Sequence, residues 1–220
     1  MTNNSSAPQL PTFGISLLLG FLVGTLSILG DIVSYDMGLV FALLNVFSTG
    51  GGWILLSIIV GWISYDLRRA LINGISSITL AMLVYYGAII FFNIRLQTDS
   101  ADLIRVALIW IVLGVMCSGV LSPATWLFRH GTATQKALVS GYIGGLLASE
   151  PLFILWTFGF GVLNIGEHGM YAAVHLASLV LALLMGGLSL YQRKILPTTL
   201  AIIAGVVSGY MVWNILPYLL

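Results

Sequence analysis

The stretch ALVSGYIGGLLASEPLFILWTFGFGVL, residues 137–163, sets a carboxylate and a proline in the middle of an apolar segment long enough to cross a bilayer. A charge at the centre of a membrane helix costs roughly 2.5 to 3.5 kcal/mol, so such a residue usually faces a bundle interior or a wet cavity. We therefore expect Glu150 to be paired, protonated or hydrated within the protein. Pro151 lacks the N–H that would reach the carbonyl near Leu147, which predicts a kink beside the carboxyl group.

Composition indicates the class of protein. The chain has 220 residues, of which 59% are hydrophobic and 7% charged, and its mean hydropathy is +1.07. Soluble domains carry about 25% charged residues, so these values predict an all-α, polytopic membrane helix bundle in a lipid bilayer. The net charge of +1 provides no basic surface, and nucleic acid is not expected as a partner. The single cysteine, Cys117, excludes an intramolecular disulfide and is interpreted as a small core residue.

Long apolar segments predict about seven transmembrane helices. Residues 1–12 form a polar tail without the basic region of a secretory signal, so the first helix is expected to be retained. Residues 13–220 then form one helical domain, interpreted as a leading helix followed by three helical hairpins. The seven predicted segments are residues 13–33, 53–65, 70–92, 103–121, 137–163, 170–190 and 198–219.

The approach to the second segment is ambiguous. Residues 37–47 are apolar but too short to cross the ~30 Å hydrocarbon core as a helix. Residues 48–52, Ser-Thr-Gly-Gly-Gly, interrupt the pattern before Trp53. Two interpretations remain open: residues 48–52 form a loop or bend, or residues 37–52 form a re-entrant half-helix whose backbone lines a ligand site.

Small residues in the first helix favour close packing against another helix. Gly20 and Gly24 lie four residues apart, and Ser27 follows one turn later. Both a contact within the chain and a contact with a partner or a second copy fit this spacing.

The basic residues predict the orientation. Six of the eight occur in alternate loops, ahead of the third, fifth and seventh segments: Arg68, Arg69, Arg129, Lys136, Arg193 and Lys194. Because basic loops stay in the cytoplasm, the N-terminus should lie inside and the C-terminus outside the plasma membrane.

A resemblance rests on three landmarks: Asn45 ahead of the glycine run and Trp53, the start Arg68-Arg69-Ala70-x-x-x-Gly74 leading to Tyr85-Tyr86, and the glycine-rich helix that ends in Glu150. In these features the chain resembles a placeholder-named family, a domain of unknown function, of bacterial polytopic integral membrane proteins. The resemblance implies a bacterial plasma membrane and implies no chemistry.

Most of the unusual polar groups lie at or beyond the membrane centre on one side. Depth, at ~1.5 Å per helical residue, places Glu150 near the centre and the others toward the outer face. This predicts an outward-facing substrate pocket whose acidic floor favours a cationic or hydroxyl-rich ligand. The alternative is an interfacial aromatic belt with interhelical hydrogen bonds. The predicted site comprises Glu150, His175, Tyr85, Tyr86, Asp31, Asn45, Trp53 and Tyr210.

Motifs for catalysis are missing from the sequence. It has no HExxH, no GxSxG and no acidic pair for magnesium, and its histidines, His130, His168 and His175, are spread over different loops or sides. We expect no metal, no cofactor and no enzymatic activity. The preferred function is a small transporter or a membrane-embedded substrate-binding component. Because the chain has no nucleotide motif, a cytoplasmic energising partner would fit. The alternatives are an interaction or sensory subunit, and an intramembrane enzyme with an unfamiliar site.

Overall fold

The computed structural model describes residues 12–32, 44, 47, 50–92, 100–159, 175–187 and 194–219, and these residues form seven helices and no strand. The prediction of an all-α chain is therefore confirmed for this part. The helices are α1 (Thr12–Ile32), α3 (Gly50–Ile63), α4 (Leu67–Phe92), α5 (Ser100–His130), α6 (Ala133–Phe158), an unlabelled helix (His175–Gly187) and α8 (Ile195–Leu219).

Four helices within the described ranges are long and apolar enough to span a membrane. They are α1, α4, residues Asp102–His130 of α5, and residues Ala133–Thr157 of α6. The other three helices contribute shorter apolar stretches: Gly51–Ile63, His175–Gly187 and Ile195–Met211. These lengths and compositions are compatible with a membrane-spanning helical protein, while the number of seven spans stays a prediction.

Three predicted boundaries differ from the structure. Helix α6 ends at Phe158, five residues before its predicted end. Gly50, Gly51 and Gly52 are not a loop, because they form the first turn of α3. Helix α5 continues to His130, nine residues past its predicted end, with Pro123 inside it. Residues 1–11 of the predicted tail, the apolar segment before Phe47 apart from Leu44, and residues 160–174 lie outside the described residues.

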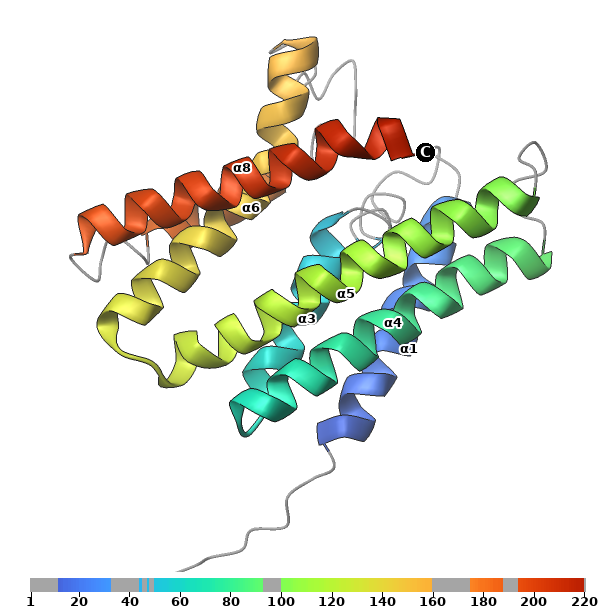
Figure 1. The fold of residues 1–220 in the computed structure, drawn as a ribbon, viewed down its shortest axis with the longest axis horizontal. Coiled ribbons are helices and arrows are strands. Elements are labelled where there is room, and N and C mark those ends of the chain that lie inside the picture. Colours follow the sequence, from blue (N-terminus) through green and yellow to red (C-terminus); the bar gives the residue numbers. More distant parts are fainter. Residues whose placement is uncertain are drawn as a thin grey trace, which may run out of the picture.

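Helices α1, α3, α4 and α5 form one group (Figure 1). Glycines permit its closest contacts: a Cβ on Gly20 would lie 2.3 Å from the Ser77 carbonyl oxygen, and one on Gly24 would lie 2.4 Å from that of Ala81. Since both numbers rise together, α1 and α4 run parallel. The small residues of α1 therefore make a contact within the chain, with Val23 and Ala81 in the core beside them.

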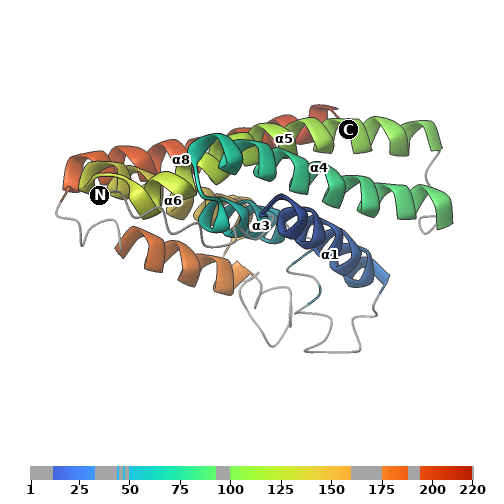
Figure 2. The same ribbon diagram turned by 90° about the horizontal axis from the view of Figure 1, so that it is seen from below.

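The second group contains α6, α8 and the helix His175–Gly187, which lies below α6 and α8 in Figure 2 (orange). Helix α8 runs parallel to α6 at backbone contact, since Gly205 lies against Tyr142 and Gly209 against Ser149. A Cβ on Gly145 would lie 2.2 Å from the Ile202 carbonyl oxygen, and one on Gly205 would lie 2.3 Å from that of Tyr142. These two glycines let the two helix backbones touch.

Helices α5 and α6 belong to different groups although a short turn joins them (Figure 1). Thr132 caps α6, since its hydroxyl accepts from the Gln135 N–H while the Gln135 side chain accepts from the Thr132 N–H. After the turn the two helices diverge. The two helices still share a buried cluster that includes Leu121, Val139 and Ile143, although α5 packs mainly on α3 and α4 and α6 mainly on α8. The arrangement in three hairpins stays a prediction.

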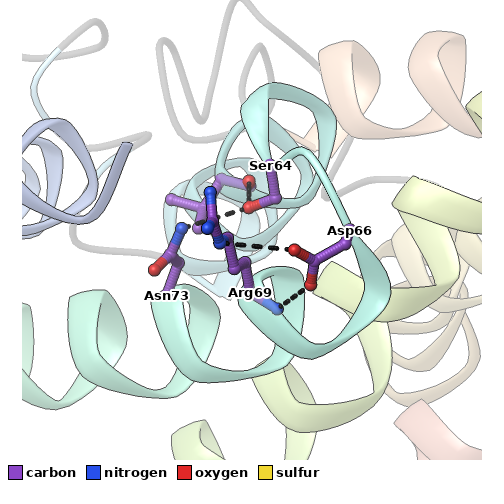
Figure 3. Close-up of polar contacts among 5 residues, drawn as sticks. Ser64, Asp66, Arg69 and Asn73 are labelled. Carbon is purple, nitrogen blue, oxygen red and sulfur yellow. Dashed lines mark hydrogen bonds and ion pairs between the residues drawn. The ribbon is translucent and has the colours of Figure 1, made fainter. Parts of the chain in front are cut away.

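The turn between α3 and α4 is fixed by polar contacts (Figure 3). One carboxylate oxygen of Asp66 accepts a 2.8 Å hydrogen bond from the backbone N–H of Arg69. The other oxygen lies 3.3 Å from the Arg69 Nε. The Asn73 amide donates to the Ser64 hydroxyl at 3.3 Å, both side chains being buried. These contacts hold α3 and α4 as a tight antiparallel pair.

Candidate functional site

A cavity of about 140 Å³ lies where the two helix groups meet. Its wall combines α3, α4 and α5 of the first group with α6, α8 and the helix His175–Gly187 of the second. Most lining side chains are apolar. The polar groups among them are the serines Ser57, Ser149 and Ser178, the indoles of Trp53 and Trp110, and the carboxyl group of Glu150.

Glycines shape the wall as well as the helix contacts. A Cβ on Gly114 of α5 would lie 2.5 Å from the Met82 methyl of α4, and one on Gly209 of α8 would lie 1.9 Å from the Ser149 hydroxyl. Both pairs line the cavity. At these two positions a larger residue would push the walls apart or close the space.

Glu150 is half-buried on α6 and faces this cavity. Among the described residues, no hydrogen bond or ion pair reaches its carboxyl group, and no lysine, arginine or histidine lines the space. Pro151, which follows it, is buried and lies inside the continuous helix. The last turns of α6 bend away from its first turns in Figure 1, as expected for a proline at this position. The carboxyl group thus stands beside a bend, open to the cavity.

An aromatic cluster connects the cavity to the end of α1. The ring of Trp53, which lines the cavity, meets Tyr85 edge-on at 6.0 Å, and Tyr85 meets Tyr86 edge-on at 4.8 Å. The Tyr85 hydroxyl donates to the Asp31 carboxylate at 2.5 Å. Four of the predicted site residues therefore form one continuous cluster, although only Trp53 of the four lines the cavity.

The remaining predicted residues lie beside the cavity or outside the described chain. His175 is buried with 2% exposure, and Ser178, one turn further along its helix, lines the cavity in its place. Tyr210 packs on Phe153 at 5.9 Å between ring centres, next to the lining residue Gly209. Asn45 is not among the described residues. Of the eight predicted residues, Glu150 and Trp53 line the cavity.

Five of the polar, aromatic or thiol side chains in the lining were not anticipated from the sequence. Cys117, interpreted as a core residue, lines the cavity while also packing against the buried cluster that joins α5 to α6. Trp110 and Ser178 carry no motif that would mark them. Ser57 and Ser149 offered a weak signal, since each is a small polar residue in an apolar helix and Ser149 precedes Glu150.

The cavity can hold a small molecule but lacks the ligands of a metal centre. In the part of the chain that the structure describes, no three His, Cys, Asp or Glu residues are grouped so that they could bind a metal ion. His168 falls outside that part. One carboxyl group, three hydroxyls and two indoles in an apolar wall are typical of a small-molecule pocket.

The comparisons with known proteins identify a family without a described activity. Residues 3–164 match the model of DUF6518, a family of unknown function. The match covers α1 to α6, and so includes Trp53, the tyrosine pair and Glu150. The predicted resemblance to a placeholder-named family is thereby confirmed. No curated protein and no solved structure matches the chain.

Proposed function

Because this chain belongs to DUF6518, a family of unknown function, we propose its role from its own geometry: it binds a small molecule within the membrane and carries it across. The observation that supports this proposal is the cavity between the two helix groups, with the half-buried Glu150 in its wall. A subunit whose polar groups only tie helices together would pair that carboxyl group. The cavity therefore favours a ligand-binding role over an interaction or sensory subunit.

The depth of the cavity fits transport. Glu150 lies fourteen residues along α6 from Lys136, roughly 21 Å at 1.5 Å per residue, within a hydrocarbon core of about 30 Å. Membrane transporters commonly hold substrate near the bilayer midplane between two helix groups that rock against each other. Here the only short link from α5 to α6 is the Gly131–Thr132 turn, which would act as the hinge within the described ranges.

The setting of this activity forms part of the proposal. We place the protein in the bacterial plasma membrane with its N-terminus in the cytoplasm, as the basic loops indicate. The role is binding and transport without catalysis. The chain has no nucleotide motif of its own. A cytoplasmic partner that supplies energy would therefore fit, as would a second copy of the chain.

The single cysteine offers a direct test. Cys117 lines the cavity, so a small neutral thiol reagent, methyl methanethiosulfonate, should modify it in the folded protein in detergent. Leu113→Trp, which fills the cavity from the same wall, should slow the modification at least about tenfold. Leu108→Trp is the matched control, because Leu108 lies on the same helix with 58% exposure and faces away. Cys117→Ser gives the background.

The result can contradict the proposal in two ways. The reaction is run at several pH values up to about 9, because the thiolate is the reacting form of cysteine. If Cys117 reacts at none of these pH values until the protein is denatured, the cavity is closed to solutes and the binding role fails. If both tryptophan variants slow the reaction equally, the rate at Cys117 depends on the packing of α5 as a whole and not on access through the cavity. A cavity-dependent reaction would then be followed by uptake measurements in proteoliposomes, with Leu113→Trp as the inactive reference.

A further inference from the structure

The cavity has one acidic side chain and no basic side chain among its described lining residues. Glu150 is the acidic side chain of this wall, and neither an arginine, a lysine nor a histidine of the described chain stands opposite. A carboxyl group in an apolar membrane helix is costly to maintain. Its position at a cavity, rather than against a basic partner, leaves room for a counter-ion supplied from outside the chain.

Aromatic side chains add to this preference. Trp53 and Trp110 bring indole rings to the wall, and indole attracts cations more strongly than the other aromatic rings do. The thioether of Met82 and the side chains of Ile54 and Ile78 complete an apolar surface around them. Such a wall accommodates the carbon groups of an organic cation better than the water shell of a metal ion.

Size limits the ligand further. An apolar cavity of about 150 Å³ holds a molecule of the size of benzene, and this cavity has about 140 Å³. Three serine hydroxyls and one carboxyl group are too few oxygen ligands to replace the hydration shell of an inorganic cation, since such ions take six or more oxygens. The ligand is therefore compact, largely apolar and positively charged.

We propose that the cavity binds a compact organic monocation, a primary amine or ammonium compound of about the size of benzylamine, with Glu150 as its counter-ion and Trp53 and Trp110 as aromatic contacts. This inference rests on the proposed function, because it assigns the ligand class of the same cavity. It predicts a charge preference that is independent of the identity of the natural ligand.

The first experiment measures that preference at Cys117. Two methanethiosulfonate reagents of similar size, one ending in trimethylammonium and one in sulfonate, are reacted with the folded protein in detergent. Each rate is divided by the rate for a free thiol in solution. The normalised cation rate should exceed the anion rate on the order of tenfold, as expected for one opposite charge at close range. In Glu150→Gln the ratio should fall close to one.

The second experiment uses protection by a matched pair of ligands. Benzylamine and benzyl alcohol have nearly the same shape and differ in charge. Benzylamine should protect Cys117 from methyl methanethiosulfonate at a concentration about tenfold lower than benzyl alcohol, which corresponds to about 1.4 kcal/mol. Glu150→Gln should remove this difference. Asp102→Asn is the control, since Asp102 is an exposed carboxylate at the start of α5, away from the cavity lining.

The outcomes separate this inference from the proposed function. If Cys117 reacts with the neutral reagent but the charged reagents react at equal normalised rates, the cavity binds small molecules and the cation assignment is overturned. If the cationic reagent still reacts faster than the anionic one in Glu150→Gln, the assignment is also overturned, because the preference for cations would then come from another group. If Cys117 does not react with any reagent at any pH of that range until the protein is denatured, the proposed function itself fails.

Discussion

The hydroxyl of Tyr85 on α4 donates a 2.5 Å hydrogen bond to the carboxylate of Asp31 in the last turn of α1. The two residues are 54 positions apart in the chain, and the phenol is 8% exposed while the carboxylate is exposed. Tyr85 also touches Trp53 and Tyr86 through its ring. The bond therefore fixes the end of α1 to the aromatic cluster that borders the cavity.

Tyr85→Phe should lower the stability of the protein by about 1 to 2 kcal/mol. A hydrogen bond to a charged group contributes about 1.5 to 3 kcal/mol, and exposure of Asp31 reduces that value. The ring contacts remain in this variant. Equilibrium unfolding in mixed detergent measures the loss, and Tyr65→Phe is the control because Tyr65 is 48% exposed. Equal stability of the two variants would show that the bond contributes nothing.

Gly20→Ala should destabilise the packing of α1 on α4 by about 1 to 3 kcal/mol. The new Cβ would lie 2.3 Å from the Ser77 carbonyl oxygen, and a backbone atom cannot move aside as a flexible side chain does. Gly14→Ala is the control on the same helix, since no atom lies within 4 Å of its Cβ position. Thermal unfolding in detergent compares them. A melting temperature for Gly20→Ala that equals that of Gly14→Ala would rule out this helix contact.

The sequence predicted the helices better than it predicted their packing. Apolar length located every described helix, because a bilayer demands long runs without charge. The spacing of Gly20 and Gly24 indicated a close contact but not that α4 would make it. Of the two interpretations of the glycine run, the loop is wrong, because glycine is a weak helix former in water yet is tolerated in a packed membrane helix. Gly51 lines the cavity from the first turn of α3.

The same limit applies to the site. Glu150 was identified because a carboxyl group in an apolar helix is costly wherever it points. Depth alone suggested His175 and Tyr210, but the side of the helix that faces the cavity depends on packing, and Ser178 and Gly209 occupy that side. In the sequence Cys117 is one residue of an apolar helix and carries no signal of a site. It lines the cavity only because the two helix groups meet there.

Cysteine labelling should establish the orientation that the basic loops predict. Thr134 is exposed at the start of α6, and Asp102 is exposed at the opposite end of α5. In a Cys117→Ser background, Asp102→Cys should react with an impermeant thiol reagent in intact cells, whereas Thr134→Cys should react only after lysis. The reverse pattern would invert the orientation, and with it the side from which the cavity is reached.

Glu150→Leu should stabilise the folded protein while it removes ligand binding. Burying a charge in a membrane helix costs roughly 2.5 to 3.5 kcal/mol, whereas an interhelical hydrogen bond in a membrane contributes about 0.6 to 2 kcal/mol. If the carboxyl group served only as a tie between helices, its removal would cost that smaller amount and lower the melting temperature. If the carboxyl group is kept for ligand binding, burying it destabilises the unliganded protein. Leucine removes that destabilisation, so the melting temperature should rise.

Glu150→Gln separates charge from shape in the same experiment. Glutamine keeps the size and the hydrogen-bonding capacity of the side chain, so assembly and melting temperature should stay near those of the wild type. Protection of Cys117 by benzylamine and uptake into proteoliposomes should both fall at least about tenfold, because the counter-ion is gone. Leu152→Met, an exposed apolar exchange two residues along α6, should leave both readouts unchanged. A Glu150→Leu variant that melts earlier than the wild type while Glu150→Gln retains full protection and uptake would make Glu150 a structural residue, and the cavity would then lose the group that gives it a charge preference.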